Sequence, residues 1–227
     1  MIGGTSGIGH ALAAGLAEHG AHVVRTGRRA PALSVDVRYR DSVDAFRNAV
    51  LERHAHVDIL VNAAGYTSKQ PTATMPEDQW SCLLDTNLTG VLRACQSFYG
   101  PLKDSGHGRI INIVSLGSFL AFHEVAAYCA SKSALLSLTR SLACEWARDG
   151  ICVNAIAPGV FPTELNNEIV KDTPRGREIL MRTPMQRFGK PKELVGAAVL
   201  LASEGASFLT GQCITVDGGY LASGVNS

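Results

Sequence analysis

Short apolar runs alternate with longer stretches of helical periodicity along most of this chain. The runs at 59–61, 109–114 and 152–157 are apolar and bounded by polar or turn residues, so they read as buried strands. Between them, residues 41–53, 77–99 and 126–149 carry apolar side chains at helical spacing. Strands that alternate with helices in this way predict an α/β fold, a doubly wound parallel sheet between two helical layers.

The same pattern extends to both ends of the chain. Ile8, Ala11, Leu12 and Leu16 form the apolar face of a helix that ends near Gly20. Further strands are expected at 21–24, 33–37 and 213–216, and a further helix at 192–202. Asp41 is the expected N-cap of the helix at 41–53, and Pro76 begins the long helix that carries Asn87.

Two features at the N-terminal end depart from this scheme. No strand precedes the first helix, although the first strand of a doubly wound sheet is central and covered on both faces. Only residues 30–32 separate the second expected strand and its arginines from the third, whereas parallel strands need a crossover of about a dozen residues. For the missing strand, either the natural start lies upstream or the chain is an impaired variant. For the short crossover, either it is stretched or a segment has been lost.

Composition limits the function classes. The 227 residues are 46% hydrophobic, enough for one domain spanning 1–227. Lysine and arginine number 21 against 20 acidic residues, so nothing favours nucleic acid or an anionic membrane, and neither a membrane span nor a signal peptide is expected. The six cysteines form no C-x-x-C pair and are expected as reduced core residues of a cytoplasmic protein. His54 and His56 have no third ligand nearby, so no metal is expected.

Tyr128 and Lys132 are the strongest catalytic candidates. They lie four residues apart, one turn of a helix. A phenol has a pKa of about 10, and a neighbouring ammonium lowers it, which makes the phenol usable as a general acid or base near neutral pH. Ser115 follows a buried strand, where its hydroxyl can hydrogen-bond to a substrate oxygen. The pair alone is equally compatible with an amphipathic surface.

Residues 1–9 form a glycine-rich turn before a helix. Glycines let the backbone approach a pyrophosphate, and the helix N-terminus favours its negative charge. At the tip of the next strand, Gly27 stands where an acidic residue would bind a ribose hydroxyl, and Arg28 and Arg29 follow. Their charge favours NADP(H), with NAD(H) as the alternative. The other interpretation is a pair of solvated loop arginines.

Taken together, these motifs resemble the short-chain dehydrogenase/reductase family over nearly the whole chain. The matching residues are Gly3-Gly4-Thr5-Ser6-Gly7-Ile8-Gly9, Asn62-Ala63-Ala64-Gly65, Asn87, Ser115, Tyr128 with Lys132, and Pro158-Gly159 with Thr163. The resemblance implies a Rossmann-type fold and NAD(P)-dependent hydride transfer. Ile2 departs from the family's usual threonine.

The resemblance also implies roles for individual residues. Asp36 and Val37 match the pair that contacts the adenine, residues 62–65 lie beneath the cofactor, and Thr163 contacts the nicotinamide amide or the pyrophosphate. Lys132 holds the nicotinamide ribose, and Asn87 holds a water of a proton relay. Relatives pair their long helices across a two-fold axis, so a homotetramer is expected.

Residues 161–189 are long, charged and irregular, as expected of a substrate lid. Glu178 and Arg182 can pair at i, i+4, which leaves Arg175 and Arg177 to reach a ligand carboxylate. The stretch is similar to the gluconate 5-dehydrogenase and 2-deoxygluconate 3-dehydrogenase branch, which implies a sugar acid or polyol as substrate. Two alternatives remain, a 3-oxoacyl thioester reductase and a catalytically silent nucleotide-binding relative.

Overall fold

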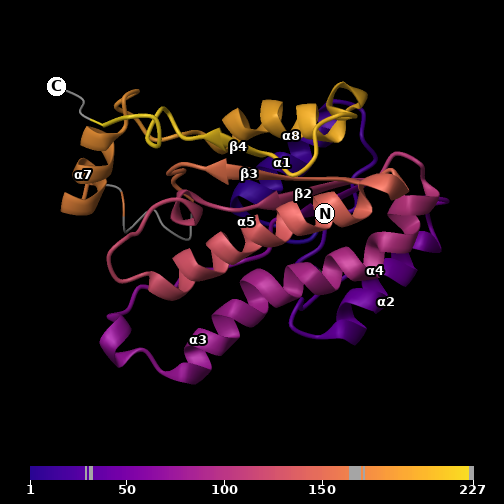
Figure 1. Cartoon of the computed structure of the whole chain (residues 1–227), viewed down its shortest axis with the longest axis horizontal. Helices are drawn as coiled ribbons and strands as arrows, with labels where there is room; N and C mark the ends of the chain where they lie inside the picture. Colours follow the sequence, from indigo (N-terminus) through magenta and orange to yellow (C-terminus); the bar gives the residue numbers. More distant parts are fainter. Residues whose placement is uncertain (29, 31–32, 164–169, 171, 225–227) are drawn as a thin grey trace.

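A four-stranded parallel sheet forms the centre of the molecule, in a computed structural model that describes residues 1–28, 30, 33–163, 170 and 172–224 (Figure 1). The strands follow one another in the order β1-β2-β3-β4. Their bounds are Ile59–Asn62, Arg109–Ile113, Cys152–Pro158 and Cys213–Val216. Each apolar run that predicted one of these strands is therefore a strand, and β2 is buried along its whole length.

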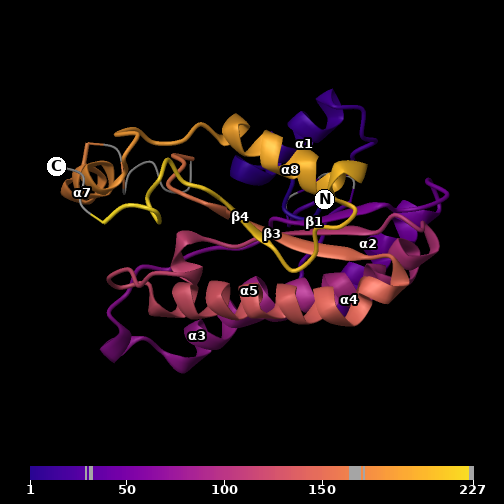
Figure 2. The same ribbon diagram turned by 45° about the horizontal axis from the view of Figure 1, so that its top comes forward.

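Helices cover both faces of the sheet, which gives the expected three layers (Figure 2). α1 (Gly7–Glu18) and α8 (Val195–Ala202) lie on one face, while α4 (Gly90–Asp104) and α5 (Ala126–Trp146) lie on the other with α2 (Arg40–Leu51) beside α4. Short 3-10 helices are found at Thr72–Thr74, Leu116–Ser118, Ala147–Asp149, Pro191–Leu194 and Glu204–Ala206. α7 (Pro174–Arg182) lies apart at one end of the molecule.

Alternation along β2 explains the two halves of the core. Ile110 packs with Leu135 and Leu142 on the α4–α5 side. Ile111 and Ile113 point the other way and pack with side chains of α1 and α8. A parallel sheet buried on both faces needs such continuous apolar strands.

The N-terminal side of the sheet differs from the prediction. The segments 21–24 and 33–37 are not strands, and only isolated bridges join Ile2 to Thr26 and to Asn62, and Gly27 to Ser34. Ile2 lies between its two partners, with its N–H donating to the Val61 carbonyl. At Gly3 the backbone turns to φ +82°, so no second residue continues the ladder.

The long helix predicted at 77–99 consists of three consecutive parts. α3 (Glu77–Leu84) leads into a π-helical turn at Asp85–Thr89, and α4 follows directly. A π turn holds one more residue than an α-helical turn, and such turns occur mostly at functional sites. Asn87 lies inside it and is fully buried. Of the expected caps, Pro76 precedes α3 as its N-cap, but Tyr39 and not Asp41 caps α2.

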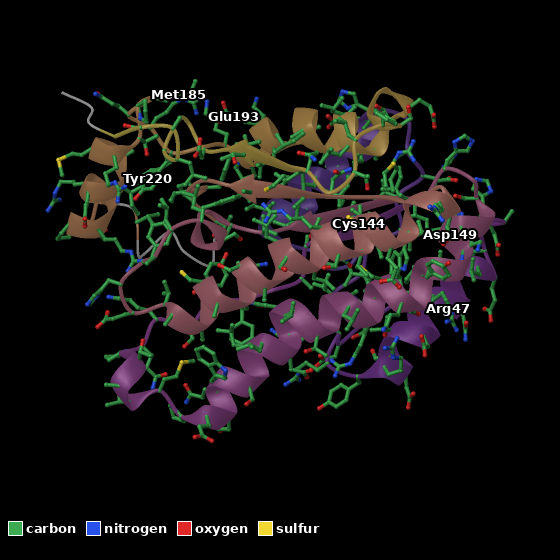
Figure 3. The ribbon with its side chains drawn as sticks, viewed as in Figure 1. Arg47, Cys144, Asp149, Met185, Glu193 and Tyr220 are labelled. Atoms are coloured by element: carbon green, nitrogen blue, oxygen red, sulfur yellow. The ribbon has the colours of Figure 1, made fainter. Side chains whose placement is uncertain are left out.

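The cysteines are unpaired, but they are not all core residues as expected. Cys95 is buried, whereas Cys144 is exposed on α5 (Figure 3). Within the described ranges, no three His, Cys, Asp or Glu side chains gather closely enough for a metal. Nor do those ranges contain a helix with the length and apolar character of a membrane span.

Candidate active site

The glycine-rich turn packs tightly against the segment that follows β1. A Cβ on Gly3 would lie 2.4 Å from the Ala64 nitrogen, and one on Gly9 would lie 2.0 Å from the Gly3 carbonyl oxygen. At Gly7, with φ +51°, the nearest atom to a Cβ is a Thr163 methyl at 3.5 Å. The glycine-rich turn and Thr163 therefore lie next to each other at the start of α1, where the N–H groups of the helix N-terminus are the kind of group that binds a pyrophosphate.

Polar side chains and amide groups border the glycine-rich turn. Thr5 and Ser6 are exposed, and Ser6 is the N-cap residue of α1 without capping the helix through its hydroxyl. Ile8, half-buried, belongs to the first turn of α1 and packs against the α1–α8 core. The Thr5 hydroxyl also lies close to Gly27, which follows the segment 21–24, because a Cβ on Gly27 would lie 2.6 Å from its oxygen. The cradle thus continues toward Arg28.

At the end of the site where the adenosine is expected, Arg28 is exposed, while Arg29 lies outside the described residues. Val37 is buried beneath Gly90, whose Cβ would come within 2.6 Å of it. The neighbouring Asp36 carboxylate forms a salt bridge of 2.6 Å with Arg38. Sequence reasoning missed Arg38, although it follows directly on the expected pair.

Residues 62–65 connect the cofactor side to the catalytic helix. The buried Asn62 amide donates to Asn112 at 2.9 Å, and Asn112 donates to the Thr139 hydroxyl of α5 at 3.0 Å. Ala63 and Ala64 carry the chain past Gly3, with the Ala63 N–H donating to the Ile2 carbonyl. These hydrogen bonds fix the position of residues 62–65 relative to the sheet.

The π turn uses Asn87 to hold the next residues. Its Oδ1 accepts from the Tyr66 N–H at 3.0 Å, and its Nδ2 donates to the Tyr66 carbonyl at 2.9 Å and to the Ser131 hydroxyl at 3.1 Å. Gly65 fills the space between, since a Cβ there would lie 3.1 Å from Asn87 Oδ1 and 3.5 Å from Lys132 Nζ. Asn87 and Lys132 therefore both lie close to Gly65.

Ser131 was not predicted, although it lies inside the motif that carries Tyr128 and Lys132. It is fully buried, and its hydroxyl donates to the Tyr128 carbonyl at 2.7 Å while accepting from Asn87. A serine one position before an inward-facing lysine was the available signal. Its contacts tie the first turn of α5 to the π turn.

Tyr128, Ser115 and Lys132 meet where β2 ends and α5 begins. The phenol of Tyr128 hydrogen-bonds with Ser115, while the Ser115 oxygen also accepts from the Gly117 N–H at 3.1 Å. Lys132 Nζ donates to the Ile113 carbonyl at 2.7 Å and lies 5.9 Å from the Tyr128 ring centroid. The three predicted catalytic side chains are thus brought together.

The protonation behaviour differs from the expectation that Lys132 lowers the tyrosine pKa. Burial raises the pKa of Tyr128, and the hydrogen bond with Ser115 opposes that shift. Burial also lowers the pKa of Lys132 to about 8. The Lys132 ammonium is directed at the Ile113 carbonyl and lies over the Tyr128 ring. Desolvation is therefore the main effect on the pKa of the phenol.

Pro158 and Gly159 end β3 and turn the chain toward the cradle. The Gly159 N–H donates to the Val216 carbonyl at 2.8 Å, and a Cβ on Gly159 would lie 2.6 Å from Asp217 Cα. This close approach to the end of β4 places Thr163 opposite Gly7. Residues 63–65, Ser115 and Gly159 with Thr163 therefore follow the carboxyl ends of β1, β2 and β3, and the glycine-rich turn leads into α1, the place where ligands bind in open α/β sheets.

Comparisons with known proteins agree with this arrangement. A family model described as enoyl-(acyl carrier protein) reductase matches residues 3–221. The chain belongs to the short-chain dehydrogenase/reductase family. It is 37% identical to gluconate 5-dehydrogenase of Gluconobacter oxydans, covering 98% of this chain and 94% of that protein. It is 34% identical to an NAD-dependent glycerol dehydrogenase of Listeria innocua, covering 97% and 92%.

A solved structure extends this agreement to three dimensions. Gluconate 5-dehydrogenase of Burkholderia cenocepacia, in complex with NADP and tartrate, is 38% identical with a TM-score of 0.94, covering 98% of this chain and 94% of that one. The predicted resemblance to the gluconate 5-dehydrogenase branch is therefore confirmed, and this short-chain dehydrogenase/reductase is an NAD(P)-dependent oxidoreductase.

Residues 161–189 of this dehydrogenase, the expected lid, are only partly described by the structure. Residues 164–169 and 171, with Glu164, Glu168 and Lys171, lie outside the described residues. Val170 and Ile179 pack with Leu116 of the loop after β2 and with the buried Tyr220 (Figure 3). A cavity of about 510 Å³ is lined by Phe161, Met185, Glu193 and Asp217 among others. Tyr128 is not part of its lining.

The charges of this region pair differently from the prediction. Arg182 does not pair with Glu178; its guanidinium lies over the Tyr220 ring, 4.9 Å from the centroid. Arg187 pairs with Glu193 at 2.7 Å. Arg175, half-buried, and Arg177, exposed, have no ion-pair partner among the described carboxylates.

Proposed function

We propose that this enzyme transfers hydride reversibly between NADP(H) and an alcohol or ketone carbon of a small polyhydroxylated substrate, a sugar acid or polyol. The observation that carries the proposal is the convergence of Ser115, Tyr128 and Lys132 in a fold whose glycine-rich turn leaves no room for a Cβ at Gly3 or Gly9. NAD(H) is the alternative cofactor. Arg28, and Arg29 with it, would meet the 2′-phosphate that distinguishes the two.

Each cofactor contact follows the position of its residue. The pyrophosphate would lie on the α1 N-terminus between the glycine turn and Thr163, with Asp36 and Val37 at the adenine and 62–65 beneath the dinucleotide. When bound, the nicotinamide supplies or accepts the hydride. The residues that would hold the cofactor are Gly3, Thr5, Ser6, Gly7, Ile8, Gly9, Arg28, Arg29, Asp36, Val37, Asn62, Ala63, Ala64, Gly65, Tyr128, Lys132, Pro158, Gly159 and Thr163.

The chain's own side chains would handle the proton. During reduction, Tyr128 donates its phenol proton to the substrate oxygen, and Ser115 donates a hydrogen bond to that oxygen as negative charge develops. Lys132 holds the ribose hydroxyls of the nicotinamide half. A proton then returns to Tyr128 by way of Lys132 and a water that Asn87 would hold, since both side chains lie close to Gly65. Oxidation reverses each step.

Substrate choice follows from the lid, which we place at 161–189. Arg175 is the strongest candidate for a substrate carboxylate, because it is half-buried on the first turn of α7 and has no described acidic partner. A lid for a long acyl chain should offer a broad apolar surface, and α7 with its neighbouring charges does not.

A direct comparison of substrates tests this proposal. With NADPH, 5-ketogluconate should be reduced faster than acetoacetyl thioester, and Arg175→Ala should raise the KM for the sugar acid more than Arg177→Ala. Faster reduction of the thioester, unaffected by either substitution, supports the 3-oxoacyl thioester reductase instead. Quenching of protein fluorescence by NADPH without turnover of any ketone or polyol supports the silent relative.

We propose further that the enzyme acts as a homotetramer in the cytoplasm. Among the described residues, no strand pairs with the outer edge of β4, and the exposed side chains of Phe119, Leu200 and Phe208 are apolar surface that a second subunit can cover. Six unpaired cysteines suit a reducing compartment. Light scattering at micromolar concentration should give four times the chain mass, and a monomer would refute the tetramer.

A further inference from the structure

Arg38 neutralises a carboxylate that would otherwise stand beside the cofactor cradle. Its Nε and Nη2 contact both oxygens of Asp36, at 3.0 and 2.6 Å, and its own N–H donates to Asp36 Oδ1 at 3.0 Å. This two-pronged geometry is the strongest ion pair an arginine forms. The side chains of Arg38 and Asp36 are 33% and 24% exposed, so water screens the pair only in part.

Other contacts hold the guanidinium in place. Arg38 Nη1 reaches the Cys82 sulfur of α3 at 3.8 Å, and the guanidinium carbon lies 5.5 Å from the Tyr39 ring centroid. On the other side, the Asp36 N–H donates to the Ser42 hydroxyl at 3.0 Å. Neither charged group is therefore a freely rotating surface side chain.

The segment that carries Asp36 runs beside the segment that carries Arg28, the expected phosphate-binding residue. The Val35 N–H donates to the Gly27 carbonyl at 3.2 Å, and the Ser34 hydroxyl donates to the Arg28 carbonyl at 2.9 Å, so these two segments run side by side. Arg28 contributes to the lowering of the Asp36 pKa, after the larger effect of the Arg38 hydrogen bond. An unpaired Asp36 would thus offset the charge of Arg28.

We propose that Arg38 is a positioning residue that determines cofactor selectivity by cancelling the charge of Asp36, so that Arg28 presents its charge to a 2′-phosphate. The inference rests on the proposed function, because it assumes an adenine dinucleotide in the cradle. Among the described residues, Arg28 and Arg38 carry two positive charges and Asp36 carries one negative charge, a net charge of +1. Removing Arg38 lowers this net charge to zero and leaves an unpaired carboxylate that repels a doubly charged phosphate bound at Arg28.

Binding of cofactor fragments tests this without relying on turnover. Isothermal titration calorimetry at low salt measures the affinity of adenosine 2′,5′-bisphosphate relative to 5′-AMP, a ratio in which shared contacts cancel. Arg38→Met should lower this ratio roughly tenfold, and the loss should shrink as salt screens the charges. Asp36→Asn/Arg38→Met should restore the ratio, and Asp36→Asn alone should raise it above the wild-type value.

Arg47→Met is the matched control. Arg47 pairs with Asp44 on α2 at 3.4 Å, and its side chain is 28% exposed, but Figure 3 places it at the far end of the molecule. This variant should leave the ratio unchanged. A merely structural role for Arg38 would lower both affinities together, and the double variant would then not recover. An unchanged ratio in Arg38→Met, or no recovery in the double variant, overturns the inference.

The same series separates this inference from the proposed function. If the wild-type protein prefers the bisphosphate but no ketone or alcohol is turned over with NADPH, the catalytic proposal fails and the ratios still decide the role of Arg38. If turnover occurs while the ratios do not respond to Arg38, the inference alone fails. If Arg38→Met does not fold, the rise expected for Asp36→Asn carries the test.

Discussion

The four paired strands and the N-terminal segments beside β1 bury their side chains equally well, but their backbones are hydrogen-bonded differently. Ile110 and Ile156 are fully buried within continuous ladders, where β2 and β3 pair over five residues. Ile2 and Val35 are 1% and 2% exposed, yet their segments form only isolated bridges. Apolar burial is therefore sufficient to place a segment, and ladder hydrogen bonds decide how firmly it is held.

This difference divides the active site. Ser115, Tyr128 and Lys132 lie on the laddered side, at the end of β2 and the start of α5. The glycine cradle, Arg28 and Asp36 lie on the bridged side. Proton transfer needs sub-ångström positioning, whereas a charged phosphate is attracted over a longer range. We therefore expect the catalytic half to be rigid and the cofactor half to open more readily.

The largest effect is expected at the rigid side. Tyr128→Phe should lower kcat by roughly a thousandfold, since it removes the transferable proton and little else. NADPH affinity, measured by fluorescence quenching, should stay within about twofold of the wild-type value. Tyr99→Phe is the control, because that hydroxyl donates to Asp149 at 2.7 Å, far from the site. Near wild-type turnover by the Tyr128 variant would remove it as the acid–base.

The next effect compares the two sides directly. Amides of β2 and β3 should exchange with deuterium at least about a hundredfold more slowly than those of 21–27 and 33–37. Mass spectrometry of peptic peptides measures both regions in one sample. NADPH should slow exchange mainly on the bridged side. Equal protection of the two regions without ligand would contradict the comparison.

A smaller effect is expected from narrowing the cradle. Gly9→Ala places a methyl group 2.0 Å from the Gly3 carbonyl oxygen, which forces the turn to move, and should weaken NADPH binding about tenfold or more. Gly100→Ala is the matched control on α4, where nothing lies within 4 Å of the new Cβ, and it should be neutral or stabilising. Thermal melts with and without NADPH separate affinity from stability.

The smallest effect concerns Lys132 and pH. Its pKa is lowered to about 8 in the folded enzyme, below that of an unfolded lysine, so the unfolded chain binds more protons between these two values. Stability due to this group therefore rises with pH above about 8. From pH 7 to 9, wild type should gain about 1 kcal/mol relative to Lys132→Met in urea unfolding. A flat difference would mean that the ammonium is not desolvated.

Sequence reasoning succeeded where local pattern decides the outcome. The apolar runs gave β1 to β4, helical spacing gave α2 and α5, and the spacing of Tyr128 and Lys132 placed them together. It failed at 21–24 and 33–37, because strand formation there depends on a partner backbone that no local window contains. Arg182 over Tyr220 and Arg38 beside Asp36 could not be chosen among many cation partners before the fold placed them.

The π turn at Asp85–Thr89 has a consequence for how this chain can change in evolution. One residue more than an α-helical turn offsets α3 from α4 by about 100° around the helix axis. Deleting a single residue there would straighten the helix, swing Cys82 away from Arg38 and withdraw Asn87 from Tyr66. The contacts of Cys82 and Asn87 thus constrain the length of the segment from α3 to α4 as much as its residue types.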